Sequence, residues 1–268
     1  MSGYEIPTLL FDIIQHVRAR NLEQPALVGV GGAQGSGKSH WCGLLEAANR
    51  GRFAHFSLDD VYLTHAERAQ MAADFHPLCS TRGPPGSHDL DLADAAIGAL
   101  EQAAPTARTA LPRFDKASDD RAPASDWPVF VGRPEAIVID GWCVGARELD
   151  EAQFARPINA LEAEEDSGGT WRGFTMSLLA NDYADFFAAF DALIYLKAPG
   201  WEIVRTWRGE QEEKLLGRAL TAGENAALDR FVMHYERITR AMLAGGHSAS
   251  WIVHLDEARN VVRIEQRS

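Results

Sequence analysis

A glycine-rich stretch at residues 31–40, GGAQGSGKSH, carries the residue types and spacing that bind phosphate groups. Its core fits G-x-x-x-x-G-K-[ST], in which backbone N–H groups surround a phosphate and the following helix adds the positive end of its dipole. The lysine of this pattern reaches the β- and γ-phosphates of a nucleotide, and the serine hydroxyl is a ligand of Mg²⁺. The residues expected to bind the nucleotide are Gly32, Ala33, Gln34, Gly35, Ser36, Gly37, Lys38 and Ser39.

The segments on either side supply the structural context that this motif requires. The small apolar run at residues 26–30 predicts a buried strand. Residues 39–49 predict a helix with Trp41, Leu44 and Leu45 on its apolar side. A strand, a loop and a helix in this order favour a true phosphate loop over the alternative, a glycine-rich turn with an incidental lysine.

Acidic residues end two further predicted strands. Asp59 and Asp60 close the strand at residues 53–58, and Asp140 lies near the end of the apolar strand at residues 135–142. That second run is apolar throughout its middle, as expected for a parallel strand covered on both faces. A carboxylate at the end of a strand beside a phosphate loop lies near the metal, so Asp140 is the expected Mg²⁺ ligand together with Ser39. The alternative for each carboxylate is the capping of a turn.

Strands and helices alternate along the rest of the chain. Because such alternation with loops at the strand ends is typical of doubly wound sheets, we expect a P-loop NTPase fold, a doubly wound parallel sheet with helices on both faces, in a single domain over residues 1–268. An amphipathic helix at residues 6–20 is expected to dock on it. Further strands are predicted at residues 108–114, 192–198 and 250–255, and further helices at 64–73, 90–102 (capped by Asp89), 172–190, from about 199 onwards, and 226–243.

The composition limits the kinds of partner that the protein is expected to bind. A net charge of -12 argues against nucleic acid and anionic membranes, which are held largely by Lys and Arg. No run approaches the roughly 20 apolar residues of a membrane span, and no basic region precedes an apolar one at the start, so a cytoplasmic protein is expected. Cys42, Cys79 and Cys143 are far apart and expected to be reduced, and the histidine spacing predicts no zinc site. Nothing in the sequence indicates the oligomeric state.

A guanine-specific [NT]-K-x-D motif and the protein-kinase signatures are absent, which leaves an ATP-dependent kinase of a small molecule or an ATPase with a mechanical cycle. The motifs GAQGSGKS, SLDDVYLT, RGPPGSHD, FDK, DDRAP, DGWCVGA, WRG and VRTWRGEQE occur over residues 26 to about 243. In order and spacing they resemble the plant-type D-glycerate 3-kinase family, which is similar in turn to uridine kinases, phosphoribulokinases and bacterial pantothenate kinases. The resemblance implies transfer of the ATP γ-phosphate to a hydroxyl of D-glycerate, giving 3-phosphoglycerate.

The resemblance also implies catalytic roles. In the related kinases an acidic residue after the second strand faces the acceptor hydroxyl, which makes Asp59 the expected proton acceptor. Asp60 would point the other way on an extended chain, toward substrate or metal-bound water. Lys38 serves the transferring phosphate. Arg205 and Arg208 lie three apart on a helix and match lid arginines, which implies a helical lid at about residues 199–218; the alternative is a solvated helix with ion pairs to Glu202 and Glu212.

A hydroxy acid requires a cation for its carboxylate and polar groups for its hydroxyls. Arg82 and His88 in RGPPGSHD, and Lys116 and Arg121 in the long polar loop at residues 115–127, offer them, although each could be a solvated surface charge. Tyr62, in SLDDVYLT, is assigned to the same site. Trp171 and Arg172 match the family without an assigned role.

Three departures and two alternatives remain. The family commonly has Thr where this chain has His40 and Ser87, and frequently Glu where it has Asp140, so direct or water-mediated metal contact stays open. The acceptor could instead be a nucleoside, pantothenate or another hydroxy acid. A different class of function, a non-catalytic regulatory ATP-binding protein, would need no acceptor pocket.

Overall fold

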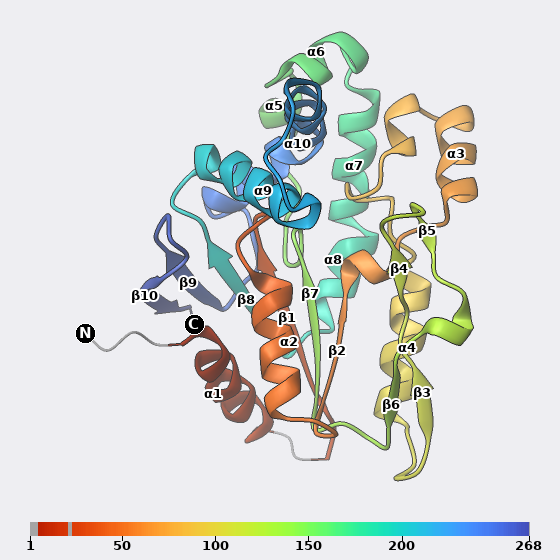
Figure 1. The fold of residues 1–268 in the computed structure, drawn as a ribbon, viewed down its shortest axis with the longest axis vertical. Coiled ribbons are helices and arrows are strands. Elements are labelled where there is room, and N and C mark those ends of the chain that lie inside the picture. The colour runs from red at the N-terminus through yellow and green to blue at the C-terminus, as the bar shows by residue number, and fades with distance from the viewer. Residues whose placement is uncertain (1–4, 21–22, 268) are drawn as a thin grey trace.

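A six-stranded sheet forms the centre of the protein. The computed structural model describes residues 5–20 and 23–267 (Figure 1). Neighbouring strands run parallel except at one edge, where β10 is antiparallel to β9. The strand order is β10-β9-β8-β1-β7-β2, with bounds β1 Ala26–Gly32, β2 Phe53–Ser57, β7 Ala136–Gly141, β8 Ala192–Lys197, β9 Trp251–Leu255 and β10 Val261–Gln266.

Helices cover both faces of this sheet, each over its own apolar core (Figure 1). On one face lie α1 (Ile6–Arg18), α2 (Lys38–Ala48) and α9 (Trp201–Leu216). The other carries α4 (Leu90–Glu101), α7 (Thr170–Ala180), α8 (Asp182–Ala188) and most of the buried side of α10 (Ala222–Leu243). The expected doubly wound fold is confirmed.

Local sequence signals account for several element boundaries. Thr64 and Glu67 form the predicted capping box of α3 (His65–Asp74), and the Asp89 side chain caps α4 by accepting from the Leu92 N–H. The apolar side of α1 is buried against the sheet, as its periodicity predicts. None of the described helices is long and apolar enough to cross a bilayer.

Two predicted elements are wrong. The strand expected at residues 108–114 is interrupted by Pro112, and its two parts leave the main sheet: β3 (Arg108–Ala110) pairs with β6 (Val129–Val131), and β4 (Phe114–Asp115) with β5 (Asp120–Arg121). The helix expected at residues 172–190 breaks at Asn181, whose backbone is not helical (φ -120°, ψ -92°). Strand β10 and the short helices α5 (Glu151–Phe154) and α6 (Ala160–Glu165) are present without having been predicted.

Parallel pairing brings the important strand ends together. Val30 of β1 and Ser57 of β2 both lie beside Asp140 of β7. The phosphate loop, the turn after β2 and the Asp140 carboxylate therefore share one edge of the sheet, where ligands of doubly wound folds bind.

Candidate active site

The phosphate loop has a backbone that requires glycine. Gly35 (φ +73°) and Gly37 (φ +90°) are both left-handed, and Gly37 is the N-cap of α2. A Cβ on Gly35 would lie 2.5 Å from the Cβ of Trp207 in α9, so a larger residue has no space there. The loop is thus a cradle of backbone atoms at a helix N-terminus, which fits the triphosphate of a nucleotide.

Lys38 is buried at the centre of this cradle. Its Nζ donates a 3.1 Å hydrogen bond to the carbonyl of Ala33, across the loop. Burial lowers the pKa of its ammonium group, while the nearby carboxylates of Asp140 and Asp59 act in the opposite direction. The lysine is therefore held between the loop and the two acidic strand ends.

Ser39 and Asp140 form the oxygen pair that fits Mg²⁺. The Ser39 Oγ donates a 2.7 Å hydrogen bond to Oδ2 of Asp140, and the Asp140 side chain is fully buried. A hydroxyl and a carboxylate are the oxygen ligands that this hard cation prefers. A second residue holds the other oxygen of Asp140, so the orientation of this carboxylate is fixed by the protein itself.

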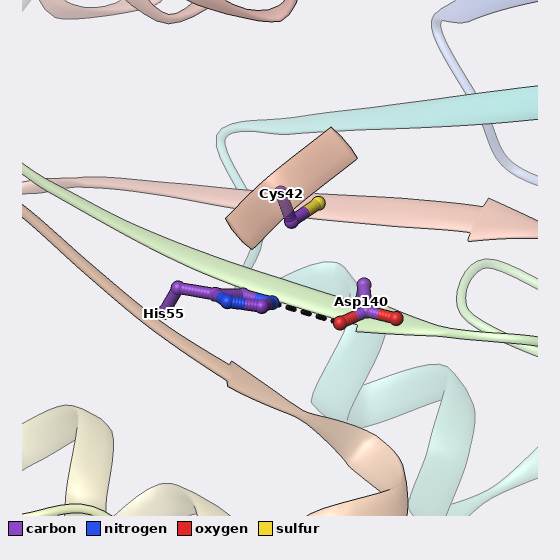
Figure 2. Close-up of side chains that lie close together, drawn as sticks. All are labelled: Cys42, His55 and Asp140. Carbon is purple, nitrogen blue, oxygen red and sulfur yellow. Dashed lines mark hydrogen bonds and ion pairs between the residues drawn. The ribbon is translucent and has the colours of Figure 1, made fainter. Parts of the chain in front are cut away.

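That second residue is His55 of β2. Its Nε2 lies 2.8 Å from Oδ1 of Asp140 (Figure 2). Burial would lower the pKa of His55, but hydrogen bonds to Asp140 and Glu46 outweigh it and raise the pKa to about 9. His55 is thus a cation at neutral pH that orients Asp140 from beneath the site.

Cys42 of α2 completes a small cluster with these two residues. The ligand atoms of Cys42, His55 and Asp140 all lie within 4.8 Å of one another (Figure 2). Their sequence spacing gave no sign of this grouping, because the three residues come from three different elements. A thiol and an imidazole suit a softer cation than Mg²⁺, so the oxygens of Ser39 and Asp140 remain the better magnesium ligands.

The chain after β2 is a 3-10 turn, η1 (Leu58–Val61), rather than the extended segment we expected. The Asp60 carboxylate accepts from the backbone N–H of Ser57 at 3.0 Å and of Phe114 at 3.4 Å. Burial raises its pKa. These contacts favour turn capping for Asp60 over the substrate or metal-water role.

Both oxygens of Asp59 are hydrogen bonded. Oδ1 accepts from the Tyr62 hydroxyl at 2.7 Å, and Oδ2 accepts from Nζ of Lys116 at 2.6 Å. Burial alone would raise the pKa of this carboxyl, but the Lys116 charge and both hydrogen bonds outweigh it and hold the pKa below its usual value. Asp59 is therefore ionised, and it lies within the field of Lys38.

His88 lies against Tyr62 and has one nitrogen to spare. The two rings stack with centroids 4.8 Å apart, and Nδ1 lies 2.6 Å from the Tyr183 hydroxyl. Because that oxygen already accepts from the Gly86 N–H, its proton can go to Nδ1, which leaves the His88 proton on Nε2. Nε2 is buried and has no hydrogen-bond partner among the described residues. Burial lowers the pKa of His88 to about 4, so the ring is neutral at pH 7.

The two arginines expected to bind substrate hold the surrounding loops together in this structure. Arg82 forms an ion pair with Asp119 and lies over the ring of Phe114. Arg121 donates to the carboxylate of Asp89 at 2.9 Å and to the carbonyl of Tyr62 at 3.2 Å. Lys116, by contrast, contacts Asp59 directly.

Arg205 and Arg208 both lie on α9, and both are engaged in ion pairs. Arg205 pairs with Asp229 of α10, not with Glu202 as the alternative proposed. Arg208 pairs with Glu212, as that alternative did propose. One nitrogen of Arg208, NH1, is nevertheless buried with no hydrogen-bond partner among the described residues.

The structure gives Trp171 and Arg172 packing roles and adds a residue that the sequence did not reveal. Trp171 is buried, and Arg172 forms a buried ion pair of 3.2 Å with Asp166. Arg259, in the turn between β9 and β10, donates to the carbonyl of Gly35 at 2.7 Å and stacks on Trp207 at 4.8 Å. Its φ of +66° is unusual for a residue other than glycine. No local motif marks Arg259, because only the fold brings it to the phosphate loop.

Known proteins are similar to this chain in sequence and in fold. The chain is 30% identical over 227 residues to the uncharacterized kinase mug58 of Schizosaccharomyces pombe, with 79% of each protein covered. It is 25% identical over 261 residues to the chloroplastic D-glycerate 3-kinase of Arabidopsis thaliana. This match covers 89% of this chain but only 54% of that protein. A solved D-glycerate 3-kinase from Cryptococcus neoformans superposes with a TM-score of 0.78 at 23% identity, covering 98% of this chain and all of that one. No family model matches the chain.

The phosphate loop and the doubly wound sheet together define a P-loop phosphotransferase. The chain belongs to the glycerate kinase-like family of P-loop kinases. The resemblance seen in its motifs is confirmed, and the protein is an ATP-dependent phosphotransferase with an alcohol group as acceptor.

Proposed function

We propose that the protein transfers the γ-phosphoryl group of ATP to a hydroxyl of D-glycerate, giving 3-phosphoglycerate. Two of the similar proteins described above carry the name D-glycerate 3-kinase, one matched by sequence and one by fold. The observation that carries the proposal is the contact of 2.6 Å between Asp59 and Lys116, which joins a proton acceptor to a cation for a substrate carboxylate. An acceptor that bears both a hydroxyl and a carboxylate matches this pair.

The nucleotide side of the reaction belongs to the phosphate loop. Backbone N–H groups of residues 32–39 bind the phosphates, and Lys38 neutralises charge on the group in transfer. Ser39 and Asp140 are the residues that would hold Mg²⁺, and the bound ion would neutralise further phosphate charge. His55 keeps the Asp140 carboxylate in one orientation.

The acceptor side is formed by the turn after β2 and the loops around it. Asp59 takes the proton of the attacking hydroxyl, and Lys116 binds the substrate carboxylate. The neutral His88 offers its buried Nε2–H to a substrate oxygen. Arg82 and Arg121 keep these loops in place through their ion pairs. Arg208 has one nitrogen, NH1, with no hydrogen-bond partner among the described residues, and this nitrogen is available to bind the transferring phosphate.

A coupled assay of ADP release tests the acceptor. Purified protein is supplied with ATP, Mg²⁺ and, in separate reactions, D-glycerate, L-glycerate, glycerol, a nucleoside and pantothenate. D-Glycerate should give the highest kcat/KM, and the product should be identified as the 3-phosphate by mass spectrometry and NMR. If D-glycerate released no ADP above background while another acceptor did, the substrate would be wrong and the kinase assignment would stand.

A further inference from the structure

The base of the proposed reaction is masked by a residue of the chain itself. Lys116 Nζ lies 2.6 Å from Oδ2 of Asp59, and the Tyr62 hydroxyl occupies Oδ1. A carboxylate paired with an ammonium group accepts a proton less readily than a free one, because the cation stabilises its charged form. With Lys116 in this position, Asp59 is a poor acceptor for the proton of an alcohol or of water.

Lys116 combines an exposed side chain with an anchored backbone. Its side chain is 55% exposed, and a lysine stem of four carbons can move its charge over several ångströms. The backbone is anchored because the neighbouring Phe114 is buried, packs edge-on against Tyr62 and donates its N–H to Asp60. The ammonium group can therefore change partners without a change in the fold.

The other carboxylates of the same hairpin are already engaged. Asp115 accepts from Ser118 and from the Ala117 N–H, Asp119 pairs with Arg68 and Arg82, and Asp120 accepts from the N–H groups of His65 and Arg121. Asp59 is the carboxylate to which Lys116 is paired in this structure. A new anion that binds beside it would compete for Lys116 with Asp59 alone.

We propose that Lys116 is a specificity-determining lock on Asp59, which opens only when the acceptor brings its own carboxylate. This inference rests on the proposed function. The substrate carboxylate draws the ammonium group away, and Oδ2 of Asp59 then accepts the hydroxyl proton. The hydroxyl oxygen forms a bond to the γ-phosphorus, the bond from that phosphorus to the bridging oxygen breaks, and ADP leaves with the electron pair. Asp59 afterwards returns its proton to water.

The lock has two consequences. A neutral polyol fits the hydroxyl position but leaves Lys116 on Asp59, so it is a poor acceptor. Lys116 likewise keeps Asp59 from accepting a proton from water, so ATP is protected from hydrolysis while no acceptor is bound. Recognition of the acid group and activation of the base are thus the same event.

The test compares an anionic acceptor, its neutral analogue and water. Wild type and Lys116→Met are assayed for kcat/KM with D-glycerate and with glycerol, and for ATP hydrolysis without acceptor. In the variant we expect D-glycerate turnover to fall by about 10- to 100-fold, as for the loss of one hydrogen bond to a charged group. Turnover of glycerol and of water should rise at least several-fold, which loss of a binding residue alone would not produce.

Two further variants make the outcome specific. Lys116→Arg keeps the charge and should keep glycerol and water turnover low. Arg113→Met removes a neighbouring cation of nearly equal exposure, 58% against 55% for Lys116, and should leave the preference for glycerate unchanged. Thermal melting checks that each variant is folded.

The possible failures are distinguishable. If the wild type used glycerol as efficiently as D-glycerate, both the proposed substrate and the lock would be wrong. If it preferred D-glycerate but Lys116→Met left glycerol and water turnover at or below the wild-type level, the lock alone would be overturned, and Lys116 would be an ordinary substrate-binding residue.

Discussion

Ser39 and Asp140 are joined by a hydrogen bond of 2.7 Å, although 101 positions separate them in the chain. The bond connects the last residue of the phosphate-loop motif to the end of β7. The other oxygen of Asp140 is held by His55, so the carboxylate is fixed from two sides. A metal-binding carboxylate with both oxygens oriented in this way loses little freedom when the ion binds.

This arrangement predicts a graded effect on the Mg²⁺ requirement. Asp140→Asn removes the charged ligand, and His55→Gln leaves the ligand but loosens its orientation. We expect the Mg²⁺ concentration for half-maximal activity to rise about 10- to 100-fold in His55→Gln, the usual effect of a residue that orients a metal ligand, and further in Asp140→Asn. Titration with MgCl₂ at saturating ATP measures it. An unchanged requirement in Asp140→Asn would remove this residue from the metal site.

Mutation of Asp59 should distinguish a kinase from a protein that only binds ATP. Asp59→Asn preserves shape but cannot accept the acceptor proton, so turnover should fall by about 10²- to 10⁴-fold. The affinity for ATP should change little, because the phosphate loop binds the nucleotide. Steady-state kinetics and nucleotide titration measure the two effects, and Asp91→Asn, at an exposed position of α4, is the control. Normal turnover would remove Asp59 from the mechanism, whereas an equal loss of ATP binding would make it a metal or structural residue.

Arg205 and its partner can be separated by mutation. If Arg205 contacts the transferring phosphate, Arg205→Ala should lower kcat by about 10²- to 10³-fold, the usual loss for one stabilising donor, with little change in the Kd for ATP. Asp229→Ala removes the same ion pair between α9 and α10 but keeps the arginine, so its kcat should stay near the wild-type value. Equal losses in the two variants would mean that Arg205 acts through the packing of α9 on α10.

His88 should leave a signature in the pH dependence of stability. Its folded pKa is about 4, below the usual 6.5, so below pH 6.5 the unfolded chain binds a proton that the folded protein does not. The free energy of unfolding should therefore fall as the pH is lowered, by roughly 1–2 kcal/mol between pH 6.5 and 5 from this residue.

Urea unfolding of wild type and His88→Gln over this pH range measures that contribution. The variant lacks the titrating ring, so its stability should decline less steeply. His234 and His247, whose pKa values are also lowered, are present in both proteins and cancel in the comparison. Parallel curves would show that His88 is protonated equally in both states.

The parts of the site that follow from local pattern were predictable from the sequence. The phosphate loop depends on consecutive residues, and Asp140 depends on its place at the end of an apolar strand. The turn that engages Asp60 also had a local signal, since Ser57 and Asp60 have the spacing of a capping box. The preceding strand pattern instead favours a continued extended chain, and the capping contacts of Ser57 and Asp60 override it.

Other features depend on contacts that no local pattern encodes. The ion pair of Arg205 with Asp229, the bond of Arg259 to the phosphate loop and the contact of Tyr183 with His88 each join segments far apart in the sequence. Local sequence patterns also gave a wrong prediction where two signals competed. Apolar periodicity continues through Asn181, but the backbone there leaves the helix, and two helices form where one was expected.

The position of Trp207 has a consequence for any closing motion of α9. The Trp207 ring is fully buried, lies beneath Arg259, and donates its N–H to the carbonyl of Glu257. The backbone and Cβ of Trp207 leave no room for a side chain on Gly35. The helix cannot move at this residue without displacing the phosphate loop. Its far end is different, since Leu215 is 74% exposed. Arg259 also pairs with Glu210, so the fixed part of the helix extends at least to that residue. A hinge inside α9 would therefore lie beyond Glu210, and Arg205 and Arg208 would both stay with the stationary part.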